Sequence, residues 1–222
     1  MKKLLLFVGI LVATSSMGWA AACTDGTLAS YEGLGSTGCT IDGLTFANFG
    51  FSGSATGGAL APTATAVNVV ACPEANPFCS DLPAGEEGFV FQVSSSTTSN
   101  ETVDAGITYT VSGQIVDALA LTAGGGTSGT GSIFVDETSN PSLVNLHVIG
   151  GSGTDTQTFA PVSNLTVTKD IAVSGGTDGT ASLSFVANGW STVPEPSTLA
   201  FLMVGSLGLL GFAKRRQKKQ AE

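Results

Sequence analysis

Apolar and polar residues alternate at a period of two in many short stretches between residues 44 and 185. These stretches are bounded by Gly, Ser, Thr, Asn or Pro, a pattern typical of β-strands that bury one face. The clearest sets are Phe89, Phe91 and Val93; Ile107, Tyr109 and Val111; Val144, Leu146 and Val148; Leu165, Val167, Ile171 and Val173; and Leu183 with Phe185. The ranges 44–51, 66–70, 114–121 and 132–135 alternate less regularly. Together they predict about nine short strands.

Helical periodicity is absent between the two termini, where no apolar pattern repeats every 3.6 residues. Runs rich in Gly, Ser and Thr at 124–131, 150–158 and 174–181 favour hairpin turns. We expect 72–88, which holds three prolines, to form a long loop, and 94–100 to form an exposed one. The sequence therefore predicts an all-β ectodomain with an antiparallel β-sandwich or jelly-roll-like fold.

Residues 1–22 have the three parts of a secretory signal peptide. Lys2 and Lys3 form the charged region, residues 4–13 an apolar core too short to span a membrane, and residues 14–22 a zone of small residues. Cleavage after Ala20 or after Ala22 fits the small-residue pattern equally well. The folded domain is therefore predicted over residues 23–193, a length within the range of one all-β domain.

The predicted domain is strongly acidic. Between residues 23 and 193, fifteen Asp and Glu face a single Lys or Arg, Lys169, which gives a formal charge of −14. Nucleic-acid binding depends on clustered Lys and Arg, so this composition argues against a nucleic-acid partner. Solubility is the simplest role of such a surface, and attraction of cations or basic partners is the alternative.

All four cysteines lie in the predicted exported domain, where an oxidising compartment favours disulfides. Four cysteines allow three connectivities, of which we prefer the local pairs Cys23–Cys39 and Cys72–Cys79. Lipidation of Cys23 directly after the signal peptide is a competing use, and it would leave Cys39 without a partner. The spacing fits no zinc site, because no CxxC occurs and the single histidine is remote.

Catalytic patterns are weak, and we predict neither an enzyme nor a cofactor or metal site. The only histidine, His147, falls on the polar phase of its strand, and no GxSxG or HExxH sequence occurs. The acidic pairs at 86–87 and 136–137 are expected to be exposed charges of loops or strand ends. Glycine patterns at 33–38 and 124–129 lack the strand–helix context of nucleotide binding. The single calcium-repeat-like stretch at 150–155 lacks the required tandem copies, which leaves a lone surface calcium site open.

The C-terminal thirty residues have a different composition from the domain. Pro194, Glu195 and Pro196 are followed by Ser197 and Thr198, by an uncharged apolar run at 199–213, and then by a basic cluster, Lys214, Arg215 and Arg216. The residue before a proline is held extended, which suits binding in a protease cleft. Residues 197–213 would form a helix of about 26 Å, at the short end of a membrane span. The basic cluster would stop transfer and keep the tail 214–222 in the cytoplasm.

A Pro-Glu-Pro sequence directly before a short apolar span and a basic end resembles the PEP-CTERM sorting domain, here over residues 194–216. The resemblance implies recognition of Pro194, Glu195 and Pro196 by an exosortase. It also implies removal of the span, and delivery from the inner membrane to the cell surface or extracellular matrix of a Gram-negative bacterium. The family is associated with exopolysaccharide production. A plain C-terminal anchor would explain the span and the basic cluster but not the prolines.

We therefore expect a non-enzymatic surface or matrix protein. A carbohydrate-binding or adhesive module is the alternative, in which Trp190, Tyr109 and Tyr31 could form a sugar-stacking platform, although core packing is the default for these residues. An envelope hydrolase built from scattered carboxylates is the third hypothesis.

Overall fold

The computed structural model describes residues 20–73, 79–80, 82–83, 85–141 and 143–193. The elements are β1 (Ala21–Ala22), β2 (Gly26–Thr27), α1 (Leu28–Glu32), β3 (Cys39–Ile41), β4 (Leu44–Thr56), β5 (Asn68–Cys72), β6 (Glu87–Gln92), β7 (Ser95–Thr97), β8 (Thr102–Gly129), β9 (Ser132–Asn140), β10 (Asn145–Ile149), β11 (Gly153–Ser174) and β12 (Gly179–Val193). The all-β prediction is confirmed. Most of the predicted signal peptide, the Pro-Glu-Pro sequence and the predicted span at 197–213 lie outside the described residues.

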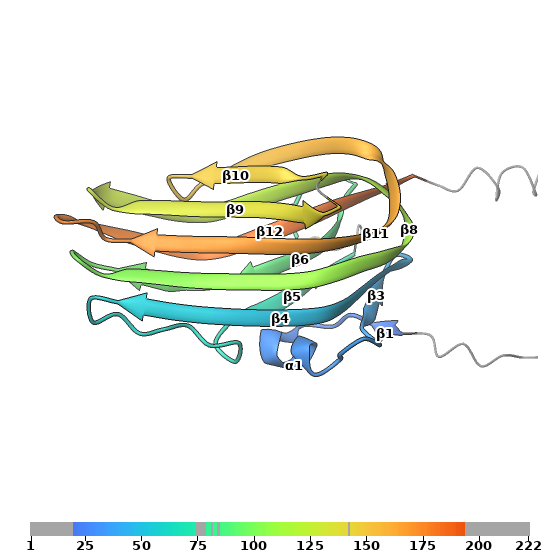
Figure 1. Cartoon of the computed structure of the whole chain (residues 1–222), viewed down its shortest axis with the longest axis horizontal. Coiled ribbons are helices and arrows are strands. Elements are labelled where there is room, and N and C mark those ends of the chain that lie inside the picture. Colours follow the sequence, from blue (N-terminus) through green and yellow to red (C-terminus); the bar gives the residue numbers. More distant parts are fainter. Residues whose placement is uncertain (1–19, 74–78, 81, 84, 142, 194–222) are drawn as a thin grey trace, which may run out of the picture.

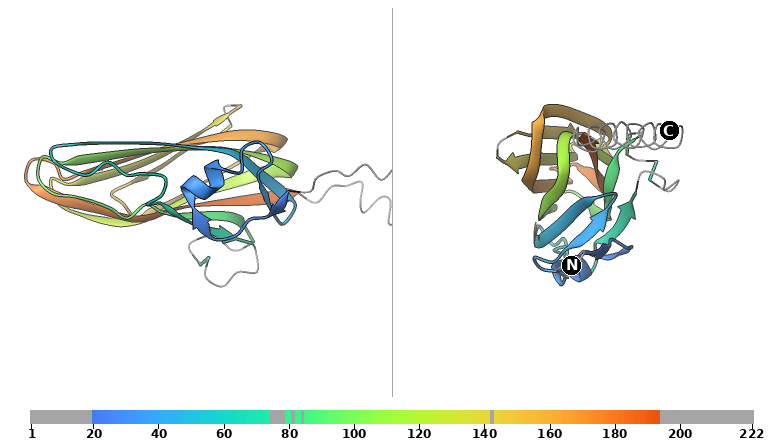
Figure 2. Two further views of the ribbon diagram at one scale, coloured as in Figure 1. Left: turned by 90° about the horizontal axis from the view of Figure 1, so that it is seen from below. Right: turned by 90° about the vertical axis from the view of Figure 1, so that its right-hand side faces the viewer.

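The twelve strands form one continuous sheet that curls over to make two layers (Figures 1 and 2). In the first layer, the initial half of β8 pairs with β4 and with the second half of β11, which in turn pairs with β9. In the second layer, the later half of β8 pairs with β12, followed by β6, β5 and β2. The strands β8 and β11 therefore belong to both layers. Apart from the parallel pair β1–β3, all pairings are antiparallel.

The bends in β8 and β11 lie at the end of the molecule where β12 finishes (Figure 1). In β8 the pairing with β4 ends at Gly113, whose φ of 118° is open to glycine but strained for other residues. In β11 the register shifts twice between Thr158 and Asn164, which marks a bulge. Two predicted strands, 107–111 and 114–121, are consequently one strand of 28 residues.

The glycine-rich run 124–131 is strand up to Gly129 and not the predicted turn, which leaves only its last two residues as a connection. Close packing against β12 explains this. A Cβ on Gly124 would lie 2.1 Å from the Phe185 ring, and one on Gly125 would lie 2.4 Å from the Ser182 carbonyl oxygen. Glycine is needed here because the neighbouring chain approaches the backbone closely. The predicted loop 94–100 likewise contains β7, and α1 was not predicted.

Aromatic rings occupy the middle of the core between the two layers. Phe46 and Phe89 pack edge to face with centroids 4.7 Å apart, and Phe49 stacks on Tyr109 at 5.4 Å. Trp190, from the second layer, meets Tyr109 at 6.3 Å. Such aromatic pairs add about 0.5–1.5 kcal/mol each beyond the area they bury. The apolar phases of β4, β6, β8 and β12 therefore meet in a single core.

Strand β10 closes the open side of the curled sheet. It pairs with β9 through one edge, and its other edge faces side chains of β11. Asp155 Oδ2 accepts from the His147 backbone N–H at 2.9 Å, and Gln157 Oε1 accepts from the Asn145 N–H at 3.1 Å. Unpaired backbone groups at a strand edge invite association with other chains. At this edge of β10, the side chains of Gln157 and Asp155 accept from two of the backbone N–H groups.

Candidate functional site

Four polar side chains lie in the middle of the hydrophobic core, and none has any exposed surface. They are Tyr109 on β8, Glu137 on β9, Lys169 on β11 and Asn188 on β12. Glu137 and Lys169 are directly opposite each other on adjacent strands of the first layer. Asn188 comes from the second layer, between the buried residues Val186 and Trp190. We call these four residues the core polar cluster.

The hydrogen bonds of the core polar cluster converge on Glu137 and Asn188. Lys169 Nζ donates to Glu137 Oε2, and Asn188 Nδ2 donates to the same oxygen at 2.8 Å. The Asn188 amide also donates to the Ala120 carbonyl oxygen at 3.1 Å. Tyr109 Oη donates to Asn188 Oδ1 at 2.7 Å. The amine and the amide nitrogen therefore share one carboxylate oxygen, while the phenol holds the amide oxygen.

Burial dominates the electrostatics of the core polar cluster. It lowers the pKa of the Lys169 amine, although the nearby Glu137 carboxylate acts in the opposite direction. The pKa of the Tyr109 phenol is raised, first by burial and then by the charge of Glu137, so the hydroxyl remains a donor. Burial therefore disfavours the charged forms of both the amine and the phenol.

A buried ion pair contributes little net stability, because desolvating both charges costs as much as their attraction returns. Glu137 Oε1 is buried and has no hydrogen-bond partner among the described residues, which adds to that cost. Packing alone therefore does not account for the core polar cluster. The site lay beyond the sequence-based predictions, which identified Lys169 only as the single base of the domain.

The predicted exposure of the two acidic pairs is wrong for three of the four residues. Glu137 has no exposed surface and Glu87 is 4% exposed, while Glu86 is half-buried. Burial raises the pKa of Glu86 to about 7. The side chain of Asp136 is 48% exposed, in line with the prediction for this pair.

His147 lies on the outer surface, as predicted. Its side chain is 47% exposed, and Nδ1 lies 2.6 Å from Asp136 Oδ1 on the neighbouring strand β9. This arrangement is a surface pair between adjacent strands.

The predicted sugar-stacking platform is wrong. Trp190 and Tyr109 are fully buried, and Tyr31 is 3% exposed. Tyr31 packs edge to face on Phe49, with ring centroids 5.0 Å apart. The default expectation of core packing is therefore confirmed for all three rings.

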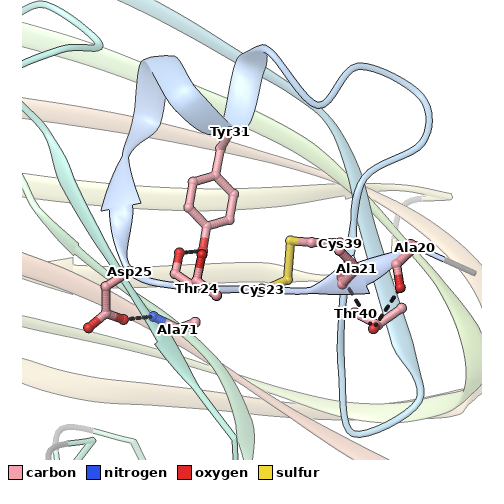
Figure 3. Close-up of a disulfide and its surroundings, with 9 residues drawn as sticks. All are labelled: Ala20, Ala21, Cys23, Thr24, Asp25, Tyr31, Cys39, Thr40 and Ala71. Carbon is pink, nitrogen blue, oxygen red and sulfur yellow. Dashed lines mark hydrogen bonds between the residues drawn. A yellow bond between two sulfur atoms is a disulfide. The ribbon is translucent and has the colours of Figure 1, made fainter.

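The two local disulfides, Cys23–Cys39 and Cys72–Cys79, are both present. The first joins the N-terminal segment to β3 (Figure 3). The Tyr31 hydroxyl donates to the Thr24 carbonyl at 2.8 Å, and Asp25 Oδ1 accepts from the Ala71 N–H at 3.0 Å. The disulfide accounts for Cys23, which contradicts its lipidation.

Neither a metal site nor a membrane helix appears in the described part of the chain. Within those residues, no three His, Cys, Asp or Glu side chains are grouped closely enough to hold a metal ion. In the same part, no helix has the length and apolar character needed to cross a membrane.

The last described residues lead directly into a known sorting signal. Strand β12 ends at Val193, and residues 192–217 match the family model for the PEP-CTERM protein-sorting motif. The chain carries a PEP-CTERM motif. The motif implies an exported protein that is processed by an exosortase. The PEP-CTERM match thus confirms the resemblance inferred from Pro194, Glu195 and Pro196.

No curated protein matches the chain. Among solved structures, similarity is found to TmCBM61 in complex with beta-1,4-galactotriose, with 15% identity and a TM-score of 0.28, over 62% of this chain and 86% of the other. The CBM36-1 domain of a multidomain xylanase from the hindgut metagenome of Trinervitermes trinervoides has 13% identity and a TM-score of 0.25. The match covers 65% of this chain and 100% of that domain. A family 11 carbohydrate-binding module of Clostridium thermocellum has 9% identity and a TM-score of 0.24. The match covers 64% of this chain and 88% of the module. Scores this low support no inference about fold or ligand.

Proposed function

We propose that this chain is a non-enzymatic structural protein of the bacterial cell surface or extracellular matrix. A signal peptide at 1–22 exports the domain at 23–193. A helix at 197–213 then holds the precursor in the inner membrane, with the basic cluster Lys214, Arg215 and Arg216 in the cytoplasm. An exosortase recognises Pro194, Glu195 and Pro196 and releases the domain. The observation that carries this proposal is the sorting motif that begins where β12 ends.

The position of the chain ends supports presentation of the domain away from the membrane. Strand β1 and the end of β12 lie at the same end of the curled sheet, and the β8–β9 and β11–β12 turns lie at the opposite end (Figure 1). A domain held by its C-terminal tail therefore points these turns outward. Two disulfides suit it to an oxidising extracellular environment. We extend the family's association with exopolysaccharide to this chain as a proposed partner.

The processing step is tested with Glu195→Gln, which removes one charge from the motif and keeps its prolines. Glu222→Gln is the matched control, because it makes the same change beyond the matched residues. In a host with an exosortase, the wild type and Glu222→Gln should yield a released form without the basic tail, measured by intact mass. Glu195→Gln should accumulate uncleaved in the membrane fraction. Equal release of both variants, or unchanged release after deletion of the exosortase, would reject exosortase processing.

A carbohydrate-binding or adhesive role is the second candidate, and an exposed apolar pair favours it. Phe134 on β9 is 43% exposed and Ile149 opposite it on β10 is 67% exposed. An aromatic ring on the outer face of a sheet offers a surface on which a sugar ring can stack. Leu60→Ala is the control, because Leu60 is 90% exposed and lies between β4 and β5, away from the pair. Glycan-array binding that is lost in Phe134→Ala and kept in Leu60→Ala would support this role. Absence of binding to acidic and neutral glycans would exclude it.

A further inference from the structure

The core polar cluster contains each group that an acyl transfer between two side chains requires. Lys169 supplies an amine, and Asn188 supplies a carboxamide from the opposite layer. Glu137 Oε2 accepts hydrogen bonds from both nitrogens, and the Tyr109 hydroxyl donates to the amide oxygen. Because the two nitrogens share one oxygen atom, the amine lies beside the amide group that it would attack.

We propose that Lys169 and Asn188 react to form an intramolecular amide bond, with Glu137 as the proton-transfer group and Tyr109 as the donor to the oxyanion. This cross-link rests on the geometry of the core alone and is independent of the proposed function.

The reaction is balanced without a further reactant. The neutral Lys169 amine attacks Cγ of Asn188, and a new Nζ–Cγ bond forms. Glu137 takes a proton from Nζ and delivers it to Nδ2, which leaves as ammonia when the Cγ–Nδ2 bond breaks. No atom is oxidised or reduced. The product is a secondary amide that joins β11 to β12.

Each surrounding feature favours this transfer over a resting ion pair. Burial lowers the pKa of Lys169 and so populates the nucleophilic form of the amine. The Tyr109 hydroxyl lies 2.7 Å from Asn188 Oδ1, the atom on which negative charge develops in the tetrahedral intermediate. All four side chains lack exposed surface, so water cannot compete with the amine for Cγ.

The position of the bond gives it a mechanical role. Lys169 lies in the first layer and Asn188 in the second, so the bond would tie the two layers together through the core. Strand β12 continues directly into the sorting motif. A force applied through the C-terminal end would therefore be borne by a covalent bond before β12 could be pulled out of the sheet.

Trypsin offers a direct test on the full chain, because Lys169 is the only Lys or Arg between Lys3 and Lys214. The purified protein is reduced, alkylated and unfolded in urea before digestion, so that accessibility plays no part. Trypsin does not cut after a lysine whose amine is in an amide bond. We expect the wild type to give one uncut fragment, with a mass lower than that of its sequence by one ammonia.

Fragment mass and cleavage must be measured together, because Asn188 precedes Gly189 and such a pair can lose ammonia by forming a succinimide. Loss of ammonia with cleavage at Lys169 would indicate the succinimide and overturn the proposal. Loss of water without cleavage would place the bond on Glu137 and also overturn it. Full mass with cleavage would show that no bond forms.

The role of Glu137 is tested with Glu137→Gln, which keeps the size of the side chain. This variant should be cut at Lys169 and regain the mass of ammonia. Asp136→Asn is the matched control, since it neutralises the exposed neighbouring acid and should remain uncut. An uncut Glu137→Gln would overturn the assigned role of Glu137. If Glu137→Gln fails to fold, shown by loss of buried Trp190 fluorescence, the wild-type masses decide the proposal by themselves.

Discussion

Removal of the Cys23–Cys39 disulfide should destabilise the domain by about 3 kcal/mol, the value that the chain-entropy model gives for a loop with a separation of 16 residues. The loop contains α1, which buries Leu28 completely and Tyr31 almost completely. In the double variant Cys23→Ala/Cys39→Ala, hydrogen bonds from Tyr31 and to Asp25 still hold the segment (Figure 3). The loss should therefore come mainly from the less restricted unfolded chain.

Urea unfolding followed by Trp190 fluorescence measures this effect, because Trp190 is the only tryptophan in the predicted mature domain and is fully buried. The double variant should show a lower midpoint and a larger m-value, since its unfolded state is more expanded. The effect should be independent of a Lys169–Asn188 bond, because the two closed loops do not overlap. A loss below about 1 kcal/mol would refute the reasoning, since it would mean that the N-terminal segment unfolds separately from the core.

Two further perturbations follow from single residues. The pKa of Glu86 is about 7 in the folded chain, above its ordinary value of 4.5, so the unfolded state loses its proton first and stability should fall as the pH rises from 4.5 to 7. Glu86→Gln should flatten this profile in urea unfolding. Glu101→Gln is the comparison, because hydrogen bonds from Thr98 lower the pKa of this exposed carboxyl below 4.5 and its stabilisation is lost only as the pH falls through that range. Glu101→Gln should therefore leave the slope between pH 4.5 and 7 unchanged, and an unchanged Glu86→Gln profile would contradict the assignment to Glu86. Gly38→Ala should cost about 2 kcal/mol or more in thermal unfolding, because its φ is +63° and a Cβ would lie 2.1 Å from a backbone oxygen. Gly35→Ala, with φ +54° and open space around it, should cost only about 1 kcal/mol. Equal losses of stability in the two variants would show that the close Cβ contact at Gly38 adds nothing to the cost.

The strand alternation predicted the fold class because most strands bury one face in the main core, although Val90 of β6 and Ala187 of β12 pack in a second, smaller cluster. Leu165, Val167, Ile171 and Val173 are all buried in β11, as the period of two requires. The lengths of the strands were not predictable in the same way. Strand β8 continues through Gly113 and the glycine run that follows, and glycine in a sequence marks a turn as readily as a close approach between strands.

The sorting motif was accessible from sequence because its signal is local. Three consecutive residues, an apolar segment and a basic cluster identify it without knowledge of the fold. The core polar cluster depends on contacts between residues far apart in the chain, so its partners could not be paired from sequence. Only the structure shows that Lys169 Nζ and Asn188 Nδ2 both donate to the same oxygen of Glu137.

The individual members of the core polar cluster nevertheless leave a trace in the sequence. Lys169 occupies the inward phase of β11, between Val167 and Ile171, and Glu137 occupies the inward phase of β9 after Val135. Asn188 likewise takes an inward-facing position of β12, between the buried residues Val186 and Trp190. A polar residue at a buried strand position lowers stability unless its side chain is hydrogen-bonded. Three such residues on three strands can hydrogen-bond to one another only if the fold brings their positions together. Polar residues at buried strand positions are therefore where chemistry inside a curled β-sheet should be sought, and here they include the only Lys or Arg of the predicted domain.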